Sequence, residues 1–131
     1  MATIFSKIID REIPAYIVAE DDQYIAFLDI NPLKQGHSLV VPKKEVDYVF
    51  DLDHQSLAGL FSFSKRVAKA IESVIDCNRI GVAVMGLEVP HAHVHLIPIN
   101  NMDDMNFANM KLSFGKEEME AVASKIRQTF R

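Results

Sequence analysis

Residues 90–98 (Pro-His-Ala-His-Val-His-Leu-Ile-Pro) place three histidines at alternate positions. Alternate side chains of an extended strand point to one face, so we expect His91, His93 and His95 in a row, about 6–7 Å apart. Imidazole is a nucleophile near neutral pH and also transfers protons. One ring can attack a phosphorus atom while a neighbour protonates the leaving oxygen or nitrogen, and two rings facing one phosphate stabilise its charge.

Two other interpretations of the three histidines stay open. The first is a surface or packing feature, although chance poorly explains why three of the five histidines alternate strictly. The second is a metal site, because a His-x-His pair on a strand can chelate zinc or another transition ion. The neighbouring sequence offers no convincing carboxylate or cysteine ligand, so we expect no metal cofactor; only a distant ligand would complete such a site.

The elements that position these residues follow from hydrophobic periodicity and turn signals. Apolar segments bounded by turn residues predict strands over 15–20, 23–29, 37–41, 79–85 and 90–99, the first two forming a hairpin. Helical spacing predicts a short helix over 3–9, a long helix that Asp53 caps and that ends near Ile75, and a final helix over 116–130. This order of strands and helices indicates an α+β domain with a mostly antiparallel sheet.

Apolar patterning indicates which faces are buried. The long helix has a stripe that predicts packing on the sheet, made of Leu57, Leu60, Phe61, Val67, Ala68, Ile71 and Val74 or Ile75. The longest apolar run, 80–87, contains two glycines and is interpreted as a buried strand. The polar segment 103–113 is expected to be irregular.

The bulk properties are those of one globular domain over residues 1–131, with 49% apolar and 24% charged residues. The net charge of −4 does not favour non-specific binding of nucleic acid, which requires a basic surface. Cys77 is the only cysteine, so no internal disulfide forms, which fits a reducing compartment. Early charges such as Lys7 and Asp10 interrupt any signal sequence, and no apolar run reaches the ~18–20 residues of a membrane span. We therefore expect a cytoplasmic protein that contacts no membrane.

Several linked motifs resemble one known family. Residues 91–97 are similar to the His-φ-His-φ-His-φ-φ signature (φ apolar) of the histidine-triad (HIT) family, and its Hint branch is the nearest. The lead-in 86–90 (Gly-Leu-Glu-Val-Pro) resembles the family's Gly-Gln-Glu-Val-Pro. Residues 4–14, 26–32 and 36–43 resemble its opening segment and its two central motifs, so the likeness covers roughly residues 3–100.

The resemblance implies a five-stranded, mainly antiparallel sheet packed with one long central helix and a C-terminal helix, usually paired into a homodimer. It also implies a site for a purine nucleotide. By position, His93 is the expected nucleophile, which forms a nucleotidyl-histidine intermediate, and His95 contacts the phosphate and the leaving group. His91 and His37 complete the network that orients His93.

The resemblance also implies residues that bind the nucleotide. Asp29 is expected to bind the ribose hydroxyls, and the backbone amide of Leu87 is expected near the phosphate. The expected walls of the base pocket are Ile4, Phe5, Ile8, Phe27, Leu28 and Ile30. From the residues alone, a cap of the turn before Asn31 is the favoured interpretation of Asp29, and plain core is the favoured interpretation of the apolar residues.

Three positions depart from the family's pattern. Ile80 aligns with a frequent asparagine, Leu87 with a glutamine and Ile99 with an arginine. Each lost polar contact is worth about 1–3 kcal/mol if it is buried and paired. The segment after Asn100 does not match the Hint branch, where it helps to shape specificity.

The expected function is therefore a nucleotide hydrolase or transferase that cleaves a substituent from the α-phosphate. A nucleoside phosphoramidase or a dinucleoside polyphosphate hydrolase would be an example. A nucleotide-binding regulatory module without turnover is the first alternative, which Ile80 and Leu87 favour slightly. A histidine-rich metal-binding protein is the second.

Overall fold

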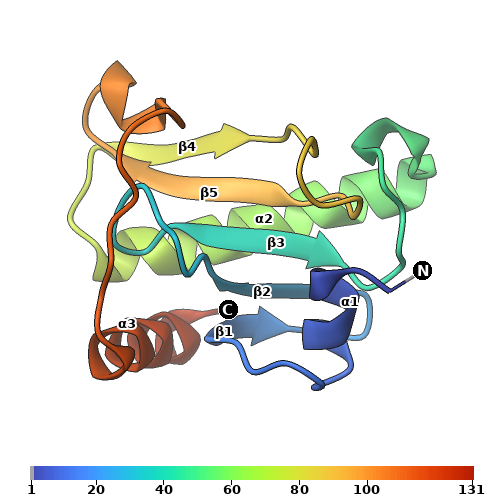
Figure 1. Cartoon of the computed structure of the whole chain (residues 1–131), viewed down its shortest axis with the longest axis horizontal. Helices are drawn as coiled ribbons and strands as arrows, with labels where there is room; N and C mark the ends of the chain where they lie inside the picture. The colour runs from blue at the N-terminus through green and yellow to red at the C-terminus, as the bar shows by residue number, and fades with distance from the viewer. Residues whose placement is uncertain (1) are drawn as a thin grey trace.

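The computed structural model describes residues 2–131, and its centre is a five-stranded antiparallel sheet of order β1-β2-β3-β5-β4 (Figure 1). The strands are β1 (Ile17–Glu20), β2 (Tyr24–Leu28), β3 (Ser38–Pro42), β4 (Arg79–Ala83) and β5 (Val94–Ile99). The helices are α1 (Ile4–Ile9), α2 (His54–Val74) and α3 (Lys116–Thr129), with 3₁₀ turns η1 (Val49–Asp51) and η2 (Met102–Met105). The predicted α+β class and the five-stranded sheet with one long and one C-terminal helix are confirmed.

Helix α2 runs behind the sheet and supplies its main cover (Figure 1). Asp53 caps it as predicted, because its carboxylate accepts the Ser56 amide hydrogen at 2.7 Å. The buried stripe of α2 differs from the predicted one in its phenylalanine. The predicted Phe61 is 43% exposed, whereas Phe63 is 2% exposed and packs against Tyr24. Among residues 2–131 no helix combines the length and apolar character that crossing a bilayer requires.

Alternate residues of the strands divide the interior into two clusters. The helical-face core lies toward α2 and α3 and includes Ala26, Val40, Val94 and Leu96. The histidine-face core lies on the opposite side of the sheet, where α1 packs, and consists of Phe5, Ile8, Ile25, Phe27, Leu39 and Val41. Odd-numbered residues of β2, β3 and β5 therefore point to the side that carries the three histidines.

The apolar run 80–87 is not a buried strand, and that prediction is wrong. Strand β4 ends at Ala83 and lies at the edge of the sheet, where Val82 is 53% exposed. The run continues into a turn at Gly86, and Leu87 is 92% exposed. An edge strand has a neighbour on one side only, so a continuous apolar pattern does not fix its burial.

Strand β5 is also shorter than predicted, because it begins at Val94 rather than at Pro90. The preceding residues bond elsewhere: the Ala92 amide donates to the Val46 carbonyl at 2.7 Å. The alternation of faces nevertheless continues through this segment. Ala92 joins the helical-face core, while His91 and His93 contact the ring of Phe5 on the other side.

Candidate active site

Four histidines meet on the histidine face, from three different segments of the chain. His95 lies on β5, His91 and His93 lie in the extended lead-in, and His37 lies immediately before β3. All four are buried, with exposed fractions from 0% for His91 to 9% for His95. Ring centroids are 5.0 Å apart for His93 and His95, and 5.2 Å apart for His37 and His95.

The tautomer of His93 follows from its hydrogen bond. Its Nδ1 lies 2.8 Å from the carbonyl oxygen of His91. A carbonyl only accepts, so Nδ1 carries the proton and Nε2 carries the lone pair. Within residues 2–131 no buried side-chain nitrogen or oxygen lacks a partner, so the unpartnered Nε2 of His93 reaches solvent. This atom can act as a nucleophile.

His91 holds that carbonyl in place through contacts at both of its own nitrogens. Its Nε2–H donates to the carbonyl of Pro42 at 2.8 Å, so its Nδ1 accepts from the hydroxyl of Thr3 at 3.0 Å. Thr3 is also the N-cap of α1, in a capping box with Ser6. Burial lowers the pKa of His91, which keeps the ring in this neutral form.

A second chain of hydrogen bonds fixes His37 and His95. The Leu33 amide donates to Nδ1 of His37 at 3.0 Å, so the proton of His37 is on Nε2. That Nε2–H donates to Nδ1 of His95 at 2.9 Å, which leaves an Nε2–H on His95 directed to solvent. Burial lowers the pKa of both rings to about 4, with a smaller contribution from Lys111 at His37.

Gly36 explains how His37 enters the site. The backbone turns here with φ +91°, a conformation that L side chains rarely adopt, and the His37 amide donates to the Lys34 carbonyl at 3.1 Å. A Cβ at Gly36 would lie 2.8 Å from Cγ1 of Ile75. Glycine therefore permits both the turn and its packing against the chain that follows α2.

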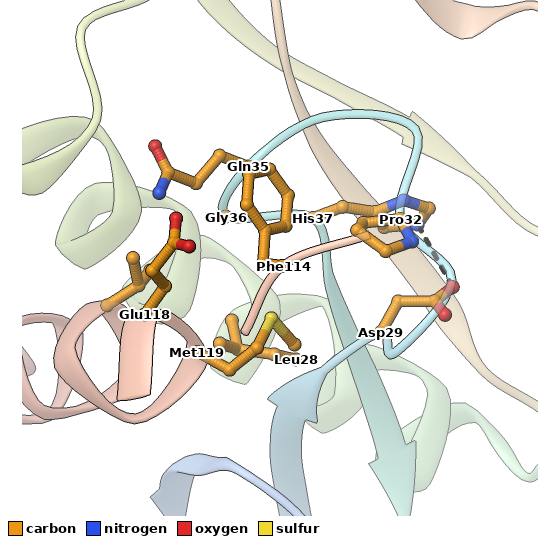
Figure 2. Close-up of a pocket in the computed structure, with 10 residues that line it drawn as sticks. Leu28, Asp29, Pro32, Gln35, Gly36, His37, Phe114, Glu118 and Met119 are labelled. Atoms are coloured by element: carbon orange, nitrogen blue, oxygen red, sulfur yellow. Dashed lines mark ion pairs between the residues drawn. The ribbon is translucent and has the colours of Figure 1, made fainter. Parts of the chain in front are cut away.

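Asp29 lies beside His37, as Figure 2 shows. One carboxylate oxygen accepts the Asn31 amide at 2.9 Å, which is the turn-capping contact, and the other lies 3.6 Å from Nε2 of His37. The pocket behind these two side chains is about 10 Å³, enough for one water molecule. A nucleotide cannot enter a pocket of this size, so this pocket is not a nucleotide site.

The expected base-pocket residues divide into three groups. Phe5, Ile8 and Phe27 pack together in the histidine-face core, and the ring of Phe5 lies 4.9 Å from that of His93. Leu28 belongs instead to the helical-face core. The third group is exposed, with Ile4 at 47% and Ile30 at 65%. Leu87, whose backbone amide was expected near the phosphate, is 92% exposed.

Ile80, one of the three departures from the family's pattern, lies on the face of the sheet opposite the histidines. Ile80 packs against the helical-face core and pairs with Pro98, so its side chain points away from the triad. A side chain at position 80 therefore does not reach the histidine face in this chain.

Sequence reasoning missed four groups that complete the site. Two are backbone groups, the Pro42 carbonyl and the Leu33 amide, which no residue type reveals. The third is the hydroxyl of Thr3, whose capping signal predicts a helix start but not a partner 88 residues away. The fourth is Phe107, whose ring lies 5.0 Å from that of His95.

Comparisons with known proteins identify the family and the fold of the chain. The model of the HIT domain matches residues 10–102. An adenosine 5′-monophosphoramidase from Schizosaccharomyces pombe is 32% identical, over 96% of this chain and 96% of its own. The crystal structure of a Hit-like protein involved in cell-cycle regulation from Bartonella henselae, with an unknown ligand, superimposes with a TM-score of 0.85 at 33% identity, covering 98% and 96% of the two chains. A zinc-bound histidine triad family protein from Mycobacterium smegmatis gives 0.81 at 25% identity, covering 98% and 95%. The chain belongs to the HIT domain family.

Proposed function

We propose that this protein is a nucleotide hydrolase that cleaves a substituent from the α-phosphate of a purine nucleotide through a nucleotidyl intermediate on His93. The observation that carries the proposal is the lone pair on Nε2 of His93, fixed by the carbonyl of His91 and open to solvent. The S. pombe relative is named an adenosine 5′-monophosphoramidase, which supports a phosphorus–nitrogen bond as the bond that is cleaved.

In the first step Nε2 of His93 attacks the α-phosphorus. A nitrogen–phosphorus bond forms, the bond to the leaving group breaks, and the leaving group departs with the electron pair and takes a proton from water. The proton on Nδ1 of His93 stays on the hydrogen bond to the His91 carbonyl. That carbonyl stabilises the positive charge that the attacking ring acquires.

His95 contributes a hydrogen bond rather than a proton. Its Nδ1 accepts from His37, and the Leu33 amide fixes His37 in the tautomer that donates. A second proton on His95 would set two N–H groups against each other, consistent with a pKa of about 4. The free Nε2–H of His95 therefore stabilises the oxygens of the phosphoryl group in the transition state.

In the second step water replaces the histidine. Its oxygen bonds to phosphorus, the bond from phosphorus to His93 breaks, and the water releases a proton. The products are the nucleoside monophosphate and the free enzyme. The scheme calls for no metal ion, because His93 supplies the nucleophile and His95 supplies the electrostatic stabilisation.

Recognition of the nucleotide is assigned to Asp29 and to the apolar side of the triad. A carboxylate that accepts two hydroxyls suits a ribose. Phe5 and Phe27, whose centroids are 5.6 Å apart, supply an apolar wall next to His93. We place the base along this wall and the sugar toward Asp29.

The test is turnover of an adenosine phosphoramidate by the wild-type protein and by His93→Ala. We expect release of AMP by the wild type, and a loss of about 10³-fold or more in the variant, with binding of AMP retained. Wild-type protein that binds AMP but shows no turnover on several phosphoramidates, acyl adenylates and dinucleoside polyphosphates would instead support the non-catalytic binding module.

A metal-binding function has one observation in its favour. Asp29, His37 and His95 offer ligand atoms that all lie within 4.8 Å of one another, a set the sequence did not reveal. A metal on Nε2 of His37 would require the proton on Nδ1, where the Leu33 amide already donates. We therefore rank this function below hydrolysis; stoichiometric metal in purified protein, lost together with activity in chelator, would reverse the order.

We also propose that two copies of the chain pair through the edge strand β4. The edge position leaves one side of the strand without a partner among residues 2–131. Val82 on the strand is 53% exposed, and Met85, two residues after its end, is 48% exposed. Sedimentation of the wild-type protein is expected to give a dimer. Val82→Lys is expected to give a monomer, and a wild type that is only monomeric would contradict the pairing.

A further inference from the structure

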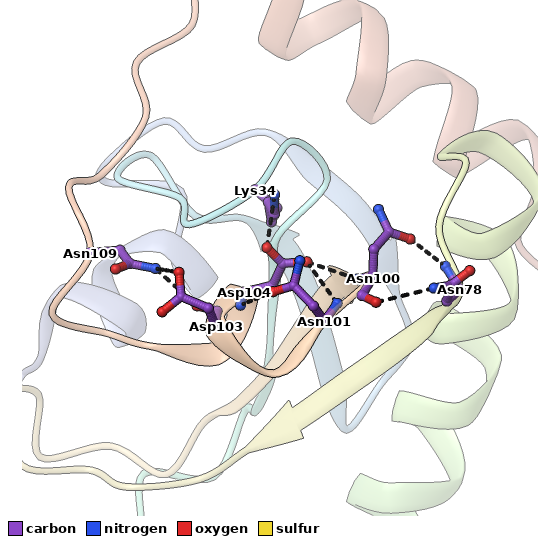
Figure 3. Close-up of polar contacts among 7 residues, drawn as sticks. All are labelled: Lys34, Asn78, Asn100, Asn101, Asp103, Asp104 and Asn109. Atoms are coloured by element: carbon purple, nitrogen blue, oxygen red, sulfur yellow. Dashed lines mark hydrogen bonds and ion pairs between the residues drawn. The ribbon is translucent and has the colours of Figure 1, made fainter.

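The segment that follows β5 is held in a defined conformation by its own asparagine and aspartate side chains (Figure 3). Asp104 accepts the backbone amides of Asn100 and Asn101 at 2.8 and 3.2 Å, and Asn101 accepts the amide of Asp104 in return. The other carboxylate oxygen of Asp104 lies 3.0 Å from Nζ of Lys34. This ion pair joins the segment to the loop that precedes His37.

Two further contacts fix the segment on the histidine face. Met105 packs against Gly81 of β4, where a Cβ would lie only 2.6 Å from its sulfur. The Leu112 amide donates to the carbonyl of Pro32 at 2.8 Å. Both ends of residues 105–112 are therefore attached to elements beside the four histidines.

This anchored segment places Phe107 against the rings of His95 and His37. Its half-buried ring meets His95 edge to face with 5.0 Å between centroids, and His37 with 6.3 Å. Phe5 meets His93 in the same manner at 4.9 Å. Because His93 and His95 also contact each other, Phe5, His93, His95 and Phe107 form a continuous row of four rings, with a phenylalanine at each end.

We propose that Phe107 is a positioning residue of this site, which holds the ring of His95 in its donor orientation and excludes water from the His37–His95 hydrogen bond. The role rests on the proposed function, because it is the Nε2–H of His95 that must face the phosphoryl group. Phe107 itself touches no reacting atom in this scheme. It acts through His95.

The charged and titratable groups around His37 and His95 affect how easily each ring gains a second proton. His95 faces His37, His93 and Asp29, and of these only Asp29 favours a proton on it. His37 is next to Asp29 and is also influenced by the ammonium of Lys111. Burial is the largest cause of the low pKa of both rings. Loss of the covering ring admits water and moves each pKa upward, toward the ordinary 6.5.

The experiment compares Phe107→Ala and Phe107→Leu with wild type, and uses Met110→Ala as the matched control. Met110 is in the same segment but is 89% exposed. The first readout is an NMR titration of the His95 ring in labelled protein from pH ~8 to ~4. The second is kcat and KM for an adenosine phosphoramidate. The thermal midpoint of each variant shows whether it is folded.

We expect the His95 pKa to rise by about one unit or more in Phe107→Ala and less in Phe107→Leu, which keeps apolar cover. We expect kcat to fall about tenfold in Phe107→Ala with a smaller change in KM, and Met110→Ala to match wild type. A His95 titration unchanged in both folded Phe107 variants would overturn the proposal. So would a loss of stability and activity as large in Phe107→Leu as in Phe107→Ala.

The NMR readout uses no substrate and therefore separates this proposal from the proposed function. A shifted titration in a protein with no turnover would uphold the role of Phe107 in ordering His95 and contradict the hydrolase. Full turnover by the wild type, together with an unshifted His95 titration in the Phe107 variants, would uphold the hydrolase and contradict the role of Phe107.

Discussion

At the residue scale, the chemistry of the site depends on which ring nitrogens carry protons. The sequence predicted the gathering of His91, His93 and His95 because strict alternation is visible in residue types. It did not predict the donors and acceptors that select each tautomer, because the decisive partners of His91 and His37 are the Pro42 carbonyl and the Leu33 amide. Backbone groups are the same at every residue, so only their placement in the fold gives them a role.

Thr3 offers a test of this network at a single atom. Thr3→Val keeps the shape but removes the hydroxyl that caps α1 and donates to His91. We expect a loss of about 1–3 kcal/mol in the free energy of unfolding and a lower kcat. Thr3→Ser keeps the hydroxyl and should retain most of both. Urea denaturation and turnover assays measure the two effects; equal behaviour of the valine and serine variants would show that the hydroxyl is not needed.

The proposed role of Asp29 predicts that the site distinguishes ribose from deoxyribose. If its carboxylate binds the ribose, Asp29→Asn should weaken AMP binding by about tenfold, and dAMP should bind the variant nearly as well as AMP does. The wild type should prefer AMP. Titration calorimetry with both nucleotides gives the comparison. A wild type that does not distinguish AMP from dAMP would leave Asp29 with its turn-capping role alone.

At the element scale, the long helix was predicted most accurately and the strands around the triad least. The Asp53 cap and the helical period of α2 are local signals, and both are confirmed. The start of β5 depends on a non-local partner, because the Ala92 amide bonds to Val46 in a distant loop. The burial of β4 depends on its place at the sheet edge, which its apolar composition does not encode.

Gly59 in α2 provides a prediction in which packing opposes helix propensity. Alanine within a helix is normally more stable than glycine by about 1 kcal/mol. A Cβ at Gly59, however, would lie 2.1 Å from the hydroxyl oxygen of Tyr24, which donates to the Ser56 carbonyl. We expect Gly59→Ala to lower the unfolding free energy by about 1–3 kcal/mol, as overpacked cores do. Thermal unfolding of Gly59→Ala, with Gly115→Ala as a control whose new Cβ meets nothing closer than 3.7 Å, decides the sign.

At the scale of the whole molecule, the buried histidines couple stability to pH. His37 and His95 have pKa values of about 4 when folded and ordinary values near 6.5 when unfolded. The unfolded chain therefore binds protons first as the pH falls, so stability is full above 6.5 and declines toward 4. Each ring accounts for up to about 3 kcal/mol over this interval.

Urea denaturation between pH ~7 and ~4.5 measures this decline. His95→Asn should flatten the curve, whereas His54→Gln, at the exposed start of α2, should keep the wild-type slope. A wild-type stability that stays constant across this interval would mean that the two rings are not held neutral by the fold.

The fold as a whole holds one imidazole with its lone pair toward solvent, and the most direct test is to capture what that lone pair attacks. Wild-type protein mixed with an adenosine phosphoramidate, quenched within its first turnover and examined by intact mass, is expected to carry one covalent AMP. Peptide mapping should place it on His93, and His93→Ala should carry none. An adduct on His91, His95 or His37, or turnover without any adduct under conditions that preserve phosphohistidine, would contradict the account.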